Sequence, residues 1–122
     1  MKQLTFEAVR SLCASRPLDL TIHAATPNSL TLVAEFDGYG EHFFIQLEDI
    51  EYIDFAPRVP IGDLALIDFS QILTISGKWL ECKSEYSGPA LVVRSDFADS
   101  WANAEPKDLF LFVANTISFE TK

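Results

Sequence analysis

Side chains able to perform nucleophilic catalysis are scarce in this sequence. A serine or cysteine nucleophile needs a base within hydrogen-bonding reach, and that base is usually a histidine. The chain has two histidines, His23 and His42, and the alternation around them places both on the polar side of a strand. No GxSxG elbow, HExxH helix, P-loop or GxGxxG turn occurs. We therefore predict no catalytic residue and favour a protein that is not an enzyme.

Carboxylates offer a second kind of chemistry, because two of them can act as acid and base if an apolar pocket raises the pKa of one. Asp68, Asp96 and Asp99 have apolar neighbours in the sequence and suit this role best. A chain with 18 acidic residues supplies such candidates by chance, however. An enzymatic domain stays open as an alternative, without an assigned residue.

The stretch DGYGEHF, from Asp37 to Phe43, combines two acids, a histidine and two glycines. A metal site of Asp37, Glu41 and His42 would need three ligand atoms converging on one ion, which a hairpin tip rarely arranges without support. A phosphate-binding loop would lead into a helix, whereas this stretch leads into a strand. Asp-Gly is typical of a tight hairpin, since both positions tolerate positive φ. We predict a turn, with no metal and no cofactor.

Negative charge is concentrated in one part of the chain, whose formal net charge is -9 at pH 7. No lysine or arginine occurs between Arg16 and Arg58. The eight acids of this interval are Asp19, Glu35, Asp37, Glu41, Glu48, Asp49, Glu51 and Asp54. A negative surface repels nucleic acid and anionic membranes and attracts basic partners. We therefore expect neither nucleic-acid nor membrane binding.

The function favoured by this charge is a non-enzymatic interaction module that binds a basic protein surface, such as an inhibitor, an immunity-type antidote or a regulatory subunit. Trp79 lies on the polar side of a predicted strand and is a candidate aromatic anchor, although burial against a neighbouring loop would also explain it. A water-facing surface that keeps the protein soluble would use the same acids. The predicted partner-binding residues are Glu35, Asp37, Glu41, Glu48, Asp49, Glu51, Asp54 and Trp79.

Apolar spacing predicts one helix and several strands. Apolar residues three to four positions apart between Thr5 and Pro17 indicate a short N-terminal helix, and residues 96–104 could form a second. Period-two alternation predicts strands over 18–24, 30–36 and 43–47, followed by a bulge or tight turn at Glu48-Asp49. Residues 61–76 fit either a helix or a strand, and 80–86 resemble a half-exposed strand.

The last predicted strand, Asp108 to Glu120, is apolar on both sides, so each of its faces must be covered. Asn115 interrupts the inward series, which indicates a turn or a bulge there. A helix would cover one face. A second layer, a homodimer partner or an apolar ligand inside a partly open β-structure could cover the other. We predict a homodimer, because symmetric pairs are the commonest soluble oligomers.

Together these patterns predict a single α+β domain over residues 1–122, with five to seven mostly antiparallel strands in a curved sheet. An all-β sandwich or open barrel is the alternative. No signal-peptide core or membrane-spanning run is visible, so we expect a cytoplasmic protein. Cys13 and Cys82 are expected to be free thiols, although a single disulfide stays possible.

Overall fold

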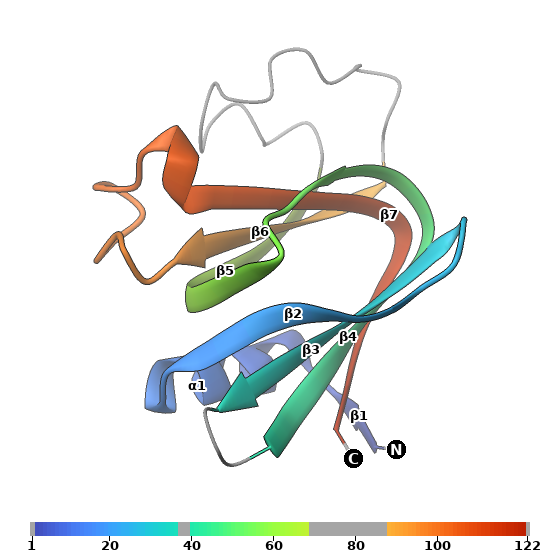
Figure 1. Cartoon of the computed structure of the whole chain (residues 1–122), viewed down its shortest axis with the longest axis horizontal. Helices are drawn as coiled ribbons and strands as arrows, with labels where there is room; N and C mark the ends of the chain where they lie inside the picture. Colours follow the sequence, from blue (N-terminus) through green and yellow to red (C-terminus); the bar gives the residue numbers. More distant parts are fainter. Residues whose placement is uncertain (1, 37–39, 69–87, 122) are drawn as a thin grey trace.

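Antiparallel strands close into a barrel, and an additional strand and one α-helix lie against it (Figure 1). The computed structural model describes residues 2–36, 40–68 and 88–121. In chain order the elements are β1 (Lys2–Leu4), α1 (Phe6–Ser15), β2 (Leu18–Ala25), β3 (Ser29–Phe36), β4 (Gly40–Asp54), β5 (Arg58–Asp68), β6 (Pro89–Ser95), the 3-10 helix η3 (Pro106–Asp108) and β7 (Leu109–Thr121).

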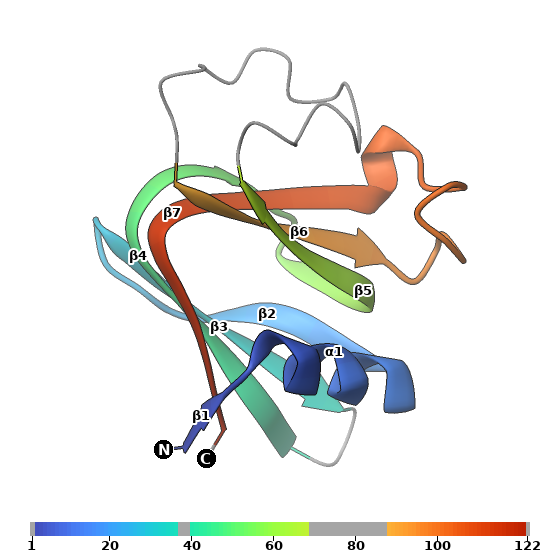
Figure 2. The same cartoon turned by 180° about the vertical axis from the view of Figure 1, so that it is seen from behind.

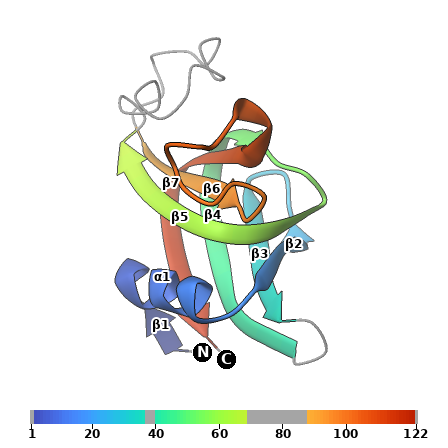
Figure 3. The same ribbon diagram turned by 90° about the vertical axis from the view of Figure 1, so that its left-hand side faces the viewer.

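The strands follow the order β1-β7-β4-β3-β2-β5-β6, and β6 pairs a second time, with β7. This pairing joins the two sides of the sheet, so every strand among the described residues except β1 belongs to a closed barrel. Strands β4 and β7 make closure possible because they are long, with 15 and 13 residues, and curve strongly (Figure 1). Strand β5 crosses in front of both in the side view of Figure 3. The barrel alternative therefore fits better than the predicted α+β architecture, in which helices would cover an open sheet.

The N-terminal helix prediction is confirmed. Thr5 caps α1 by accepting a hydrogen bond from the Ala8 amide at 3.2 Å, and the helix ends before Pro17, which cannot continue it. Its apolar face buries Val9 and Cys13 against the barrel, and the helix lies beside β5 (Figure 2).

The second predicted helix, over residues 96–104, is wrong, because this segment forms successive turns. Its backbone amides form hydrogen bonds that are not those of an α-helix. The Asp96 amide donates to the Pro60 carbonyl at 3.0 Å, and the Ala98 amide donates to the Ser95 carbonyl at 3.3 Å. The ambiguity over residues 61–76 is resolved as far as Asp68, which ends β5. The strand predicted over 80–86 lies outside the described residues.

In the hairpin of β3 and β4, the inward residues are even-numbered before the turn and odd-numbered after it, and a bulge brings them opposite each other. Leu30, Leu32 and Ala34 oppose Leu47, Ile45 and Phe43, as the predicted inward faces require. In a regular hairpin these opposed faces would require an even number of connecting residues, but Phe36 pairs directly with Gly40. The register shifts between Ala34 and Glu35, so a bulge provides the correction.

Along both β4 and β7, the inward-facing residues switch between odd and even numbers, and the two switches occur at the same place in the sheet. Glu48 pairs with Thr116, and Asp49 beside it has a φ of 53°. The register then shifts between Ile50 and Tyr52, so the bulge predicted near Glu48-Asp49 is confirmed slightly farther along the strand. Strand β7 has no turn at Asn115, which is exposed within a continuous strand. The two interruptions in the apolar pattern thus lie opposite each other, where the pair bends.

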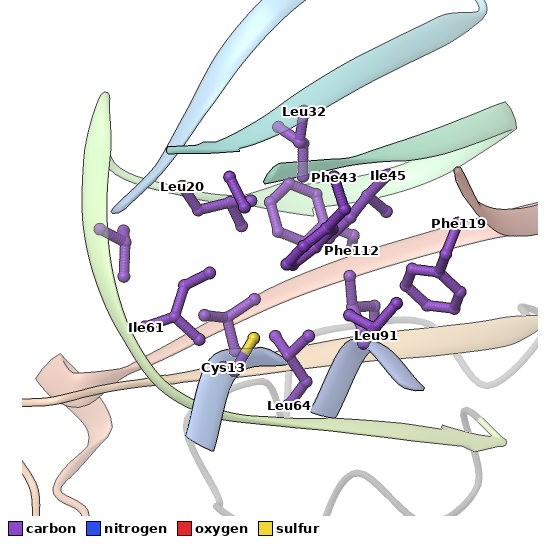
Figure 4. Close-up of a cluster of buried hydrophobic side chains, with 14 of the residues drawn as sticks. Cys13, Leu20, Leu32, Phe43, Ile45, Ile61, Leu64, Leu91, Phe112 and Phe119 are labelled. Atoms are coloured by element: carbon purple, nitrogen blue, oxygen red, sulfur yellow. The ribbon is translucent and has the colours of Figure 1, made fainter. Parts of the chain in front are cut away.

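Side chains from every barrel strand fill the interior (Figure 4). One example from each strand, at most 1% exposed, is Leu20, Leu32, Phe43, Leu64, Leu91 and Phe112. A side chain whose surface no water can touch borders no void large enough for water. An apolar ligand therefore finds no space beside these residues.

The first half of β7 is buried on both faces, as its sequence predicts. Leu109, Leu111 and Val113 form an outer cluster with residues of β6, and Trp101 and Ala104 pack against it. All three β7 side chains are at most 1% exposed in the single chain. The homodimer was predicted because this face needed a cover. The single chain already provides that cover, so a second copy is not needed for it.

Candidate functional site

The predicted acidic residues fall into two groups on the outside of the barrel. The first group lies where β2, β3 and β4 run side by side, because Glu35 pairs with both Asp19 and Glu41. Arg58 donates one hydrogen bond from Nε to the Asp19 carboxylate at 3.0 Å, and its Nη2 atom forms an ion pair with the same oxygen at 2.9 Å, which neutralises part of this charge. Arg16 stacks over the nearby Phe36 ring with 5.8 Å to its centroid. Basic residues therefore accompany this first group.

The second group, which we call the acidic bend, consists of Glu48, Asp49 and Glu51, all exposed. Within residues 2–36, 40–68 and 88–121, none of these three carboxylates forms an ion pair. Their neighbours are neutral and polar: Glu48 lies between Ser29 and Thr116 in the sheet. The acidic bend therefore carries uncompensated charge.

The two groups do not form one continuous acidic ridge. On the outer face of β4, Phe44 and Gln46 lie between Glu41 and Glu48. Phe44 is 6% exposed and packs against the His23 ring at 5.3 Å, while Gln46 accepts a hydrogen bond from Thr31 at 2.8 Å. These contacts form a neutral stretch between the two acidic groups.

Three other predicted residues need separate comment. Asp54 ends β4, half-buried and opposite Leu111, and so lies beyond the register shift between Ile50 and Tyr52. Asp37 and Trp79 lie outside the described residues. The structure therefore brings together only part of the predicted set.

A different polar site, not predicted from the sequence, lies between α1 and the β5–β6 pair. It is a groove of about 420 Å³ lined by Arg10, Ser11, Ala14, Gly62, Asp63 and Arg94. We call it the arginine groove. Strand β5 shifts register between Ile61 and Asp63, opposite Ser95 and Arg94. This bulge at Gly62 places Asp63 where α1 can reach it.

Asp63 is the centre of a hydrogen-bond network in the arginine groove. Its carboxylate accepts two bonds from Arg10, at 3.0 and 2.7 Å, one from the Trp101 indole at 2.9 Å and one from the Leu64 amide at 2.8 Å. Burial alone would raise the pKa of Asp63, but these hydrogen bonds outweigh it and hold the pKa below its usual value. The same bonds raise the pKa of Arg10. The pair is charged at neutral pH.

Arg94 is the second charge of the groove and is only 8% exposed. Its Nη1 atom donates to the Ala98 carbonyl, and its guanidinium lies 5.6 Å from the centre of the Trp101 ring. Its Nε atom is buried without a hydrogen-bond partner. A Cβ atom on Gly62 would lie 2.8 Å from Nη1, so glycine leaves room for the guanidinium.

Sequence reasoning missed the arginine groove because its residues are far apart in the chain: Arg10 and Asp63 are separated by 53 positions. Two local signals were available. Gly62-Asp63 interrupts an apolar run, which is typical of a bulge, and Arg94 is the single charged residue of β6, where it follows five apolar residues. Neither signal identifies its partner.

The candidate catalytic groups are not brought together in the described part of the chain. His23 is exposed, as expected. His42 was expected to face water but is half-buried next to the Phe36 ring at 6.2 Å, with Nε2 unpartnered, because the β3–β4 bulge falls beside it. Cys13 is a free thiol, and burial raises its pKa to about 12, so it is not a nucleophile at neutral pH. Cys82 lies outside the described residues.

Two other kinds of feature are absent from the described segments: a metal site and a membrane-spanning helix. No three histidine, cysteine, aspartate or glutamate side chains within them are placed to hold a metal ion. No helix in those segments has the length and apolar character needed to cross a membrane. In comparisons with known proteins, no family model, curated protein or solved structure matches the chain. A functional assignment must therefore come from the barrel and its two charged regions.

Proposed function

We propose that the protein is a non-enzymatic interaction module that binds a basic protein surface through the acidic bend, Glu48, Asp49 and Glu51. The observation that supports this proposal most directly is that these exposed carboxylates form no ion pair within the described residues. Unpaired charge of one sign steers a partner of opposite sign and disfavours like-charged ones. An inhibitor, an immunity-type antidote or a regulatory subunit would bind in this way.

The backbone of the acidic bend is well anchored. Strand β4 is paired with β3 and β7 on its two sides, and the Ile50 amide donates to the Asn28 carbonyl at 3.3 Å. Carboxylates on a paired strand lose less freedom on binding than those of a loose tail. The acidic bend is thus better suited to specific docking than a disordered acidic segment would be.

The first acidic group contributes less to this proposal. Asp19 already pairs with Arg58, and Arg16 lies over Phe36 next to Glu35. A basic partner that approached there would have to compete with these arginines. We therefore place the centre of the interface at the acidic bend and Glu35 and Glu41 at its periphery.

The proposal is tested with the triple variant Glu48→Gln/Asp49→Asn/Glu51→Gln. Tagged protein captures partners from the source cell at low salt, and each recovered partner is then expressed and purified. Its association rate is measured at increasing salt. We expect a basic partner whose association slows at least about tenfold in the variant or at high salt.

The matched control is Glu7→Gln/Asp96→Asn/Asp99→Asn, which removes the same charge at three exposed positions away from the acidic bend. This control is expected to associate nearly as fast as the natural chain. If no basic partner binds at low salt, or if both triple variants slow association equally, the proposed interface is wrong.

A further inference from the structure

The arginine groove contains more positive than negative charge. Arg10 and Arg94 line it together with the single carboxylate of Asp63, which leaves one positive charge unbalanced. Asp63 is not available to Arg94, because it already accepts bonds from Arg10, Trp101 and the Leu64 amide. The excess charge is therefore located on Arg94, although Asp63 is its direct neighbour in the β5–β6 register.

An arginine this deeply buried normally has its charge and its donors satisfied. Arg94 is 8% exposed, and its guanidinium has five N–H donors. Among the described residues it donates one hydrogen bond, from Nη1 to the Ala98 carbonyl, and forms no ion pair. The Trp101 ring attracts the cation but supplies no acceptor oxygen. The groove thus lacks one anionic acceptor.

We propose that the arginine groove binds a small oxyanion, a carboxylate or a phosphate, next to Arg94. The planar guanidinium matches the two oxygens of such a group and can donate two parallel hydrogen bonds. Arg10 and the exposed Ser11 line the same groove and can provide further donors from α1. A volume of about 420 Å³ accommodates a small molecule.

The local backbone keeps this site accessible. Gly62 lines the groove, and any side chain there would lie against the Arg94 guanidinium and the backbone of Ser95 and Asp96. The bulge therefore puts a residue without a side chain beside the charge that would bind the ligand. This inference is independent of the acidic bend, since the two regions share no residue.

The test is a titration of the whole ¹⁵N-labelled chain with sodium acetate or sodium phosphate, at constant ionic strength maintained with sodium chloride. The signals followed are the Trp101 indole N–H, the Gly62 amide and the Arg94 Nε–H. We expect them to shift and saturate, with half-saturation at about 1 mM for a weak complex. Tighter binding of acetate identifies a carboxylate site, and tighter binding of phosphate identifies a phosphate site.

Two variants and a control decide whether the groove is responsible. Arg94→Gln should abolish saturation, but it alters a buried residue and could fail to fold. Ser11→Asp alters an exposed helix residue, places a negative charge in the groove and should weaken binding at least about tenfold. Arg58→Gln removes a charge from the exposed Arg58–Asp19 pair and should bind normally. Shifts that never saturate, or that persist in Ser11→Asp, overturn the proposal.

Discussion

The acidic bend and the arginine groove contain similar numbers of charged groups but hold them in opposite ways. At the acidic bend, Glu48, Asp49 and Glu51 are exposed, and water solvates each carboxylate. In the groove, Asp63 accepts four hydrogen bonds, and Arg94 is almost completely buried. A charge in water can be removed at little cost in stability, whereas a buried charge depends on its partners.

This contrast separates residues that maintain the fold from residues free to bind a partner. The groove connects α1, β5, β6 and the segment after β6 through Arg10, Asp63, Arg94 and Trp101. At the acidic bend, Glu48 accepts a 3.4 Å hydrogen bond from Gln46 of the same strand, and no side-chain bond to another element is found there in the described part of the chain. Substitutions should therefore affect stability strongly in the groove and weakly at the bend.

The largest effect is expected for Gly62→Ala. The new Cβ would lie 2.8 Å from both Arg94 Nη1 and the Ser95 carbonyl oxygen and 3.1 Å from the Asp96 Cα, two of which belong to the backbone. Overpacking of this kind should lower the free energy of unfolding by about 3 kcal/mol, as measured by urea denaturation. Gly40→Asn is the control without overpacking: no described atom lies within 4 Å there, so its loss should stay near the roughly 1 kcal/mol cost of a Cβ at positive φ. Equal losses in both variants would contradict the close packing at Gly62.

Asp63→Asn should be the next most destabilising change, by about 2 kcal/mol at pH 7. The amide cannot accept all four hydrogen bonds, and the charge of Arg10 loses its counterion. Because the pKa of Asp63 is lowered in the folded protein, its contribution is present above pH of about 4 and is lost as the pH falls through the folded pKa. In urea denaturation, the difference in free energy of unfolding between the variant and the natural chain should be smaller at pH 3 than at pH 7. A difference that does not depend on pH would contradict the hydrogen-bond network around Asp63.

Asp49→Gly should act in the opposite direction. Asp49 has a φ of 53°, which glycine adopts without the steric cost that a Cβ imposes. We expect a gain in the free energy of unfolding of about 1 kcal/mol, measured by thermal or urea denaturation. Asp49→Asn, which removes the same charge but keeps the Cβ, should change stability much less. If the two variants are equally stabilised, relief of charge repulsion and not backbone conformation is the cause.

The smallest effect on stability is expected for Glu48→Gln/Asp49→Asn/Glu51→Gln, within about 0.5 kcal/mol of the natural chain. Its unfolding midpoint in urea should be nearly unchanged, since no described ion pair is broken. A large loss would show that the acidic bend has a structural role and would remove its contrast with the groove.

Much of the β-structure could be predicted from the sequence because alternation is a local property. The inward residues of β3 and β4, the phase change near Glu48-Asp49 and the two apolar faces of early β7 all follow from neighbouring residues. Alternation was only half right for β2: Leu18 and Leu20 are buried, but Ile22 is 51% exposed beside a register shift. The predicted helix over 96–104 failed because Phe97 and Trp101 have helical spacing but different environments. Trp101 bonds Asp63 across the groove, and Phe97 is 82% exposed.

The sequence alone determined which residues alternate, where the first helix begins and ends, and that negative charge gathers between Arg16 and Arg58 without a basic residue. Only the tertiary structure decided that β6 returns to β7 and closes the barrel, that the predicted acids split into two groups, and that Arg10 and Asp63 meet across 53 positions. The physical reason is that alternation and capping act over a few residues. Strand order and the pairing of buried charges depend on which distant segments pack together.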